Sequence, residues 1–337
     1  MKHFLILLSL TSLLQIDAQE LDHSFNWRNE LNVNPALADG DYLTRRKKFA
    51  SSLRCNSTGD AILWSSIQQL TPTDAISNLN LAARKKVRVG GFRFGVGGQA
   101  NVYNTTHFTF RSASFSAAHS MRITRPLTVS IGGELRANVI SLRNEFASIY
   151  ENQPSQEGIT GFSGITPGAG VHLKYDYQVL VFDKTEMGFT YRKTKQPGFM
   201  QPDPSHEITA YLETFVKLNN SQYKPAGFSL KGYYRKRTNA YSAPEDFNGN
   251  PFDAFQSITA VIGIREYKNL NGGLSYQDYF SNLKTVGAYA NYKINAFQIM
   301  AGATYTPLHK TGSANLGVRY THQRCRRAFK PVVIGCF

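Results

Sequence analysis

Hydrophobic and polar positions alternate along most of this chain. Between Leu127 and Val139 the odd-numbered residues are apolar or glycine and the even-numbered residues are polar or glycine. An extended strand with this sequence has one apolar face and one polar face. The same period of two recurs from residue 76 to residue 320, and a helical period is indicated only within LWSSIQQL, residues 63–70. The pattern predicts an all-β protein.

Fourteen strands can be placed on this pattern, many of them close to the roughly 9–11 residues that a tilted strand needs to cross a membrane. We expect strands at about 42–54, 75–86, 91–102, 106–119, 126–140, 167–175, 178–194, 206–217, 224–237, 256–266, 270–280, 284–294, 296–306 and 313–323. Residues 178–194 are counted as one strand, although Asp183 to Thr185 offer a turn that would split it.

The lengths of the links between these strands help to decide between an outer-membrane barrel and a soluble β-sandwich. With fourteen strands the longer links, 55–74, 141–166, 195–205 and 238–255, all fall on one side of the sheet. The links on the opposite side are all short, and two further short links, 103–105 and 281–283, lie on the side of the longer ones. Outer-membrane barrels have short periplasmic turns and long outer loops. The pattern favours a transmembrane antiparallel β-barrel with both termini in the periplasm. A soluble sandwich could expose the charged face to water, so link length and not charge decides between the two folds.

The surplus of basic residues indicates the charge of the barrel lumen. The chain has 38 Lys and Arg against 23 Asp and Glu, a formal net charge of +15. The basic residues are spread over the polar faces of the strands, so we expect a hydrated, net-basic lumen that attracts an acidic partner segment or anions. The basic residues expected to face the lumen and contact a partner are Arg93, Arg136, Lys231, Arg235, Arg265 and Arg319.

The first residues are typical of a secretory signal peptide. Lys2 precedes an apolar run from Phe4 to Leu14, and small Ala18 offers a cleavage site. This run is shorter than the roughly 20 apolar residues of a membrane-spanning helix. We therefore expect a signal peptide at 1–18, an N-terminal periplasmic segment at 19–40, an outer-membrane barrel at 41–323 and a C-terminal tail at 324–337. Nucleic acid is not an expected partner of such an exported protein.

Three cysteines, Cys55, Cys325 and Cys336, have no zinc or haem spacing. One disulfide is compatible with export, and a Cys325–Cys336 pair would hold the C-terminal tail; free thiols are the alternative.

Candidate catalytic residues are few. His206 and Glu207 are adjacent on a predicted strand, so they point to opposite faces and cannot act as the helical H-E-x-x-H pair does. We expect no catalytic residue, cofactor or metal, with a barrel hydrolase as the alternative. Glycine relieves crowding inside a strand and lets a barrel wall coil. Glycines inside predicted strands occur in GVGG, residues 95–98, GG, residues 132–133, GAG, residues 168–170, and GG, residues 272–273.

The segment from Leu21 to Gly40 lacks the alternation of the strands. Pro35 pushes Asn34 toward an extended conformation. Apolar anchors on one parity are supplied by Phe25, Trp27, Leu31 and Val33. We expect this segment to dock under or inside the barrel, where it plugs the lumen or contacts a periplasmic partner; a disordered leader is the alternative.

The stretch HSFNWRNELNVNPALADGDY, residues 23–42, resembles the start of the PorP/SprF family of type IX secretion outer-membrane proteins, in which an N-P-A-x-A-G element precedes the first strand. The matching residues are Asn34, Pro35, Ala36, Ala38 and Gly40, with Asp39 inserted before Gly40. Similarity continues in RFGVGGQANVYN and PGAGVHLKYD, whereas the R-x-Q-W element of the family is not recognisable.

The resemblance implies a non-enzymatic barrel in the outer membrane that anchors or helps export a cell-surface cargo protein, including in gliding motility. It implies as partners the C-terminal region of a secreted type IX cargo or adhesin, other type IX components, and outer-membrane lipid and lipopolysaccharide. The matching motif would be a periplasmic contact. A porin-like channel whose basic lumen favours anions is the second reading.

Overall fold

The computed structural model describes residues 30–39, 47–48, 53–69, 75–90, 92–104, 108–142, 161–176, 182–194, 205–218, 227–238, 255–267, 269–278, 284–307 and 310–327. Two helical turns come first, α2 (Glu30–Val33) and the 3-10 turn η2 (Pro35–Asp39). The strands that follow are β1 (Lys47–Lys48), β2 (Leu53–Gln69), β3 (Ala75–Val89), β4 (Phe92–Asn104), β5 (Phe108–Arg122), β6 (Leu127–Leu142), β7 (Gly161–Tyr175), β8 (Lys184–Thr194), β9 (Ser205–Lys217), β10 (Gly227–Thr238), β11 (Phe255–Tyr267), β12 (Leu270–Asp278), β13 (Lys284–Ile294), β14 (Phe297–Thr306) and β15 (Thr311–Arg327).

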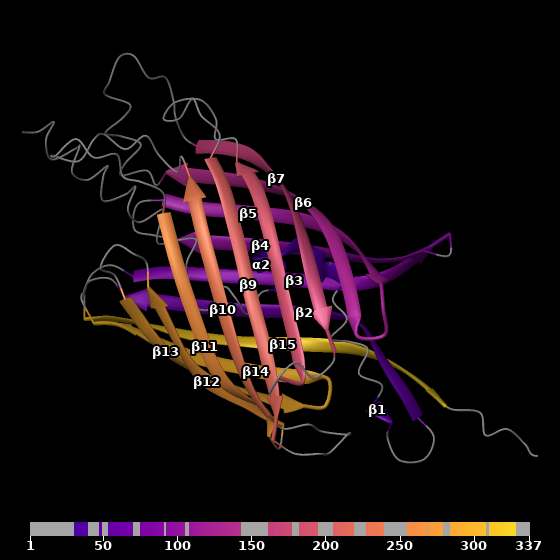
Figure 1. Cartoon of the computed structure of the whole chain (residues 1–337). Helices are drawn as coiled ribbons and strands as arrows, with labels where there is room; N and C mark the ends of the chain where they lie inside the picture. Colours follow the sequence, from indigo (N-terminus) through magenta and orange to yellow (C-terminus); the bar gives the residue numbers. More distant parts are fainter. Residues whose placement is uncertain are drawn as a thin grey trace, which may run out of the picture.

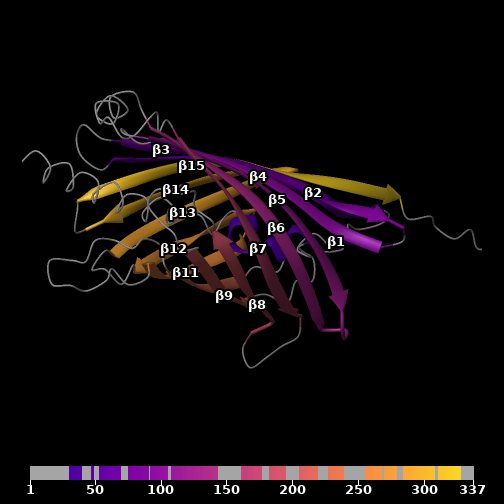
Figure 2. The same ribbon diagram turned by 90° about the horizontal axis from the view of Figure 1, so that it is seen from above.

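The sheet closes on itself. Each strand from β2 to β15 pairs antiparallel with its neighbours in sequence, and β15 pairs with β2. The result is a fourteen-strand antiparallel β-barrel, which confirms the predicted fold (Figure 1, Figure 2). The short β1 adds to β2 outside this ring.

Within the described part of the chain, no helix has both the length and the apolar character that crossing a membrane requires.

The two faces of the wall differ as the alternation predicts. On β6, Ile131 and Leu135 are exposed to the outside, Leu135 to 62%, whereas Ser130 and Glu134 are buried in the interior. The apolar face therefore points outward and the polar face lines the lumen. A soluble sandwich would have the reverse arrangement, because its apolar side chains would fill the core.

The first barrel strand lies where the sequence pattern indicated an outer loop. The prediction of a loop at 55–74 was wrong, because β2 occupies Leu53–Gln69. Of the strand predicted at 42–54, the described residues 47–48 and 53–54 lie in β1 and β2. Inward-facing Ile62 and Trp64 pack against Met300, while Leu63 on the same strand is exposed outside. Around Ile62 and Trp64 both faces of β2 are thus apolar, and the alternation that marks the other strands is missing there.

The single strand predicted at 178–194 begins later, at Lys184. Residues 177–181 lie outside the described part, and Asp183 forms a bend before β8. One strand here keeps the longest links, 143–160 and 239–254, on the same side of the barrel. β2 begins and β15 ends on the opposite side, and β15 extends to Arg327, beyond the predicted tail boundary at 323.

This topology makes a labelling prediction. In a variant whose native cysteines are replaced by serine, single cysteines introduced at residues 150 and 246 are expected to react with an impermeant maleimide in intact cells. Cysteines at residues 88 and 221 are expected to react only after the outer membrane is opened, because they lie on the short-link side, which faces the periplasm in outer-membrane barrels. The reverse labelling would contradict the orientation.

Candidate functional site

The N-terminal segment lies inside the barrel. Helical turns α2 and η2 are seen behind the strands in Figure 1 and between opposite walls in Figure 2. η2 packs against β3, β4, β5, β6 and β7, and all five of its residues are buried. The prediction that this segment docks under or inside the barrel is confirmed for residues 30–39, which we call the plug.

A row of very small residues crosses the wall beneath the plug. Gly95 on β4, Ala118 on β5, Gly132 on β6 and Gly170 on β7 lie directly opposite one another in successive strand pairs. The row therefore runs across the strands rather than along one of them. We call these four residues the seat.

The plug approaches the three glycines of the seat too closely for a side chain at those positions. A Cβ added at Gly132 would lie 2.6 Å from the Cα of Ala36, and one added at Gly95 would lie 2.2 Å from the Cα of Asp39. A Cβ at Gly170 would lie 2.1 Å from Oδ1 of Asn34. Glycine at these positions relieves crowding, as the sequence predicts, and the crowding group is the plug.

Polar contacts fix the two ends of the plug to the same row. Lys86, opposite Gly95 on β3, is 3.7 Å from Asp39, whose Oδ2 also accepts a 2.8 Å hydrogen bond from the Ser120 backbone. At the other end Thr190, opposite Gly170 on β8, donates a 3.0 Å hydrogen bond to the carbonyl of Val33. The plug is therefore aligned along the row over six neighbouring strands, β3 to β8.

Asn34 has a special place in this alignment. Its Nδ2 donates a 2.8 Å hydrogen bond to the carbonyl of Val171, and its Oδ1 accepts a 2.9 Å hydrogen bond from the backbone of Ala36. The side chain thus joins the barrel wall to the turn that begins at Pro35. An apolar residue at position 34 would leave these buried backbone groups without their partner.

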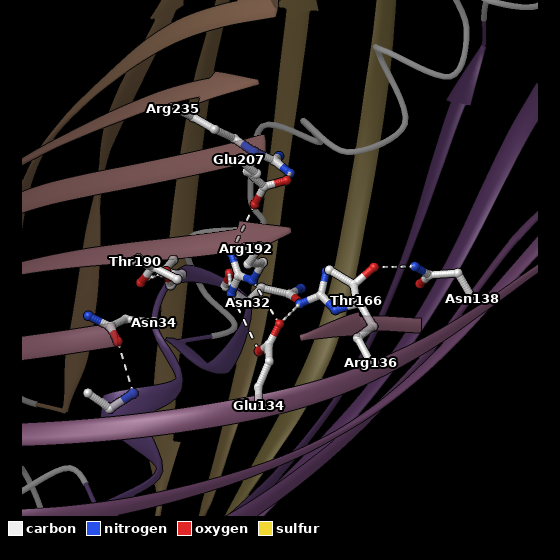
Figure 3. Close-up of polar contacts among 12 residues, drawn as sticks. Asn32, Asn34, Glu134, Arg136, Asn138, Thr166, Thr190, Arg192, Glu207 and Arg235 are labelled. Atoms are coloured by element: carbon white, nitrogen blue, oxygen red, sulfur yellow. Dashed lines mark hydrogen bonds and ion pairs between the residues drawn. The ribbon is translucent and has the colours of Figure 1, made fainter. Parts of the chain in front are cut away.

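A first network of charges holds the start of the plug. Arg192 donates from Nε to Glu134 at 2.7 Å, from one terminal nitrogen to Glu207 at 2.9 Å, and from the other to the carbonyl of Asn32 at 2.7 Å (Figure 3). Arg235 binds the second oxygen of Glu207 at 2.7 Å. Because Arg192 is buried and bonded on both sides, it links three strands of the wall to the plug backbone.

A second network lies on β2, β3 and β15. Arg84 binds Asp60 through two nitrogens at 2.6 and 2.8 Å, and it also donates a 3.1 Å hydrogen bond to the carbonyl of Leu37. Glu30 of the plug is 2.7 Å from Arg84 and 3.3 Å from Arg319. Burial raises the pKa of Glu30, but the attraction of Arg84 and Arg319 outweighs burial and lowers that pKa to about 2. Glu30 is therefore ionised at neutral pH.

The predicted motif residues meet the wall from inside the barrel. Asn34, Pro35, Ala36 and Ala38 are buried in the lumen, and Gly40 lies outside the described residues. Ala36 faces Gly132 and Ala38 packs with Ala118, so small side chains suit both positions. A contact between this motif and a periplasmic protein stays a prediction.

The predicted basic residues are paired where their side chains are described. Four of the six form ion pairs with carboxylates inside the barrel: Arg136 with Glu134, Lys231 with Glu213, Arg235 with Glu207, and Arg319 with Asp60. The side chains of Arg93 and Arg265 lie outside the described part, as do the side chain of Cys325 and all of Cys336. The carboxylates offset the expected positive potential of these groups, and their contact with a partner stays a prediction.

Sequence reasoning missed Arg84 as a plug contact and Asp60 as the carboxylate that binds Arg84. Asp60 was assigned to a loop, so no lumen position was expected for it. Arg84 continues the inward parity of Asn78 and Asn80 on β3, and this parity is the signal that would have found it.

Within the described residues, no group of three His, Cys, Asp or Glu side chains is arranged to hold a metal ion. His172 and Tyr211 are joined by a 2.5 Å hydrogen bond in the lumen, and Tyr211 packs against Val33 and Leu37 of the plug. This pair supports the plug from β7 and β9.

The seat predicts a strong difference between two neighbouring glycines. Gly132→Ala is expected to weaken plug docking by about 1–3 kcal/mol, because the added carbon meets the backbone of Ala36. Gly133→Ala is the matched control: its added carbon meets nothing nearer than 3.8 Å. Hydrogen exchange of residues 30–39 is expected to be roughly 5- to 150-fold faster in the first variant. Equal exchange in the two variants would contradict the seat.

A closed antiparallel sheet with an apolar outer face and a polar lumen defines a β-barrel of the outer-membrane class. No protein-family model matches the chain, and no curated protein matches it.

Solved structures to which the chain is similar are outer-membrane barrels. The Pseudomonas putida toluene transporter TodX shares 11% identity over 85% of this chain and 93% of that chain, with a TM-score of 0.44. The Acinetobacter baumannii outer membrane protein Omp33 shares 9% identity over 79% of this chain and 98% of its own, also with a TM-score of 0.44. The KdgM porin shares 9% identity over 78% and 99%, with a TM-score of 0.38. These values describe a general likeness between barrels and carry no information on what this one binds.

Proposed function

We propose that this chain is a non-enzymatic outer-membrane barrel of the type IX secretion and gliding machinery, which anchors or helps export a cell-surface cargo protein. One observation carries the proposal: the motif that resembles the PorP/SprF family, from Asn34 to Ala38, forms the part of the plug that lies on the seat. The residues behind the resemblance therefore have a definite structural task in this barrel.

The contacts of the plug indicate a segment that stays bound in the lumen rather than one that enters it only transiently. Carbonyl groups of Asn32, Val33 and Leu37 each accept a hydrogen bond from a side chain of the wall. Undocking would leave Arg84 and Arg192 without these acceptors and would remove the close packing of the plug against the seat. A lumen occupied in this way suits a barrel that binds protein partners, and the longest links, 143–160 and 239–254, are on the side expected to face the cell surface.

Purification from the native outer membrane tests this proposal. A tagged barrel is expected to retain type IX components and a secreted cargo protein, identified by mass spectrometry. A tagged, unrelated barrel from the same membrane is the control for proteins that bind all barrels. Recovery of only the proteins found in that control would contradict the proposal.

A porin-like channel is the second candidate, and the wall away from the seat favours it. There the buried inward-facing side chains of β11, β12, β13 and β15 include small uncharged polar groups: Ser257, Thr259, Ser275, Gln277, Thr285 and Asn315. Polar side chains on the inner face of the wall are typical of barrels with a water-filled lumen.

Conductance in planar bilayers separates the two candidates. The intact barrel is expected to carry no ion current. A form lacking residues 21–38 but retaining the signal peptide is expected to conduct ions, because the deletion removes most of the plug. Steady, anion-selective conductance of the intact barrel would favour the channel. An assembled deletion form that stays closed and keeps every partner would show that the plug has neither role.

A further inference from the structure

The closing seam of the barrel places two cysteines opposite each other. The pairing of β2 with β3 starts at Gly59, whereas its pairing with β15 continues through residues 53–57. In this extension Cys55 of β2 is the direct antiparallel partner of Cys325 of β15. The first and last strands of the barrel therefore meet at a pair of thiol-bearing residues.

An irregularity in the seam creates this match. Gly59 is opposite His322, and continuing that register would place Asn56 opposite Cys325. Instead the register shifts between His322 and Gln323, so that Ser57 is opposite Gln323 and Cys55 is opposite Cys325. The extra residue in β2 brings the two cysteines into the same position along the sheet.

Directly opposite residues of an antiparallel pair share one face of the sheet, with Cβ atoms roughly 4.5–5.5 Å apart and Cα atoms about 4.5 or 5.5 Å apart. Disulfides span Cα separations of roughly 4.4–6.8 Å. We propose that Cys55 and Cys325 form a disulfide that joins the first and last barrel strands. This pairing replaces the expected link between Cys325 and Cys336.

The compartment and the chemistry are compatible with this bond. The seam extension lies on the short-link side of the barrel, which is the periplasmic side in outer-membrane barrels, and disulfides persist in the periplasm. The two thiols lose two protons and two electrons as the sulfur–sulfur bond forms. The disulfide of a periplasmic thiol oxidase takes up these protons and electrons and becomes two thiols.

The bond would act on the one strand pair that joins distant parts of the sequence. Every other barrel pair joins consecutive strands, whereas β2 and β15 are separated by the whole barrel. A cross-link at this point encloses nearly all of the barrel in one loop, and the stabilisation expected from a disulfide increases with loop length in the chain-entropy model.

Peptide mapping tests the proposal on the full-length protein. Thiols are blocked with N-ethylmaleimide in intact cells before lysis, and the barrel is digested with trypsin without reductant. Cleavage after Arg54, Arg84, Arg324 and Arg326 gives a peptide 55–84 and a dipeptide 325–326, and cleavage after Arg327 leaves Cys336 in peptide 328–337. The proposal expects 55–84 linked to 325–326. Blocked thiols on both peptides, or either peptide linked to 328–337, would overturn it.

Electrophoresis of the denatured protein gives a second readout. A disulfide enclosing most of the chain is expected to make the unreduced, denatured barrel migrate faster than the reduced one. Cys336→Ser should keep this shift, and Cys55→Ser and Cys325→Ser should each abolish it. Loss of the shift in Cys336→Ser, or its persistence in either of the others, would count against the Cys55–Cys325 bond.

Discussion

Arg192→Met is expected to lower the free energy of unfolding by about 3–5 kcal/mol, the range for removing one partner of a buried ion pair. Methionine fills a similar volume but leaves Glu134 and Glu207 without the guanidinium between them. It also removes the hydrogen bond to the carbonyl of Asn32, so the plug and the wall are both affected. Urea unfolding in lipid vesicles, followed by tryptophan fluorescence, measures the change.

Lys193→Met is the matched control for this prediction. Lys193 is the next residue on β8, has the same charge and is exposed. Lys193 lies near the end of β8 on the outer face, so removing it is expected to change the free energy of unfolding by no more than about 1 kcal/mol. Similar losses in the two variants would mean that the buried network does not stabilise the barrel.

A charge on the outer face is expected to have the other large effect. Leu135 lies in the middle of β6 and is 62% exposed on the apolar face. Leu135→Arg is expected to destabilise the barrel by about 2–4 kcal/mol in a bilayer, because the guanidinium replaces a lipid-facing side chain near the midplane. The same unfolding measurement applies.

Leu218→Arg supplies the comparison, since Leu218 is also exposed but follows the end of β9 on the short-link side. The cost of a lipid-facing charge falls to about 0–1 kcal/mol near the interface. A cost at Leu218 as large as at Leu135 would contradict the assigned position of the membrane.

The faces of most strands were predictable because membrane strands repeat every two residues. Leu135 and Glu134 differ in parity, and this difference alone assigns one to lipid and the other to the lumen. The rule fails at β2, where Ile62 and Trp64 form an apolar cluster with Met300 inside the barrel. A strand that contributes apolar side chains to a cluster inside the lumen is apolar on both faces. The alternation that would identify this strand in the sequence is then lost.

The plug was partly predictable and its seat was not. Pro35 and the loss of alternation indicated a segment that docks against the barrel. Gly95, Gly132 and Gly170 belong to three separate glycine-containing stretches, and only the strand register places them in one row. Register depends on long-range pairing, so no local pattern shows that these glycines face the same ten residues.

The seat also makes docking of the plug depend on the correct strand register. A two-residue slip of β6 would keep its faces but replace Gly132 in the row by Ser130 or Glu134, either of which has a side chain where the plug backbone must lie. Plug docking is then blocked although the barrel can still close. Plug docking therefore depends on the register of β6, and a barrel with a slipped register is expected to leave residues 30–39 undocked and open to proteolysis.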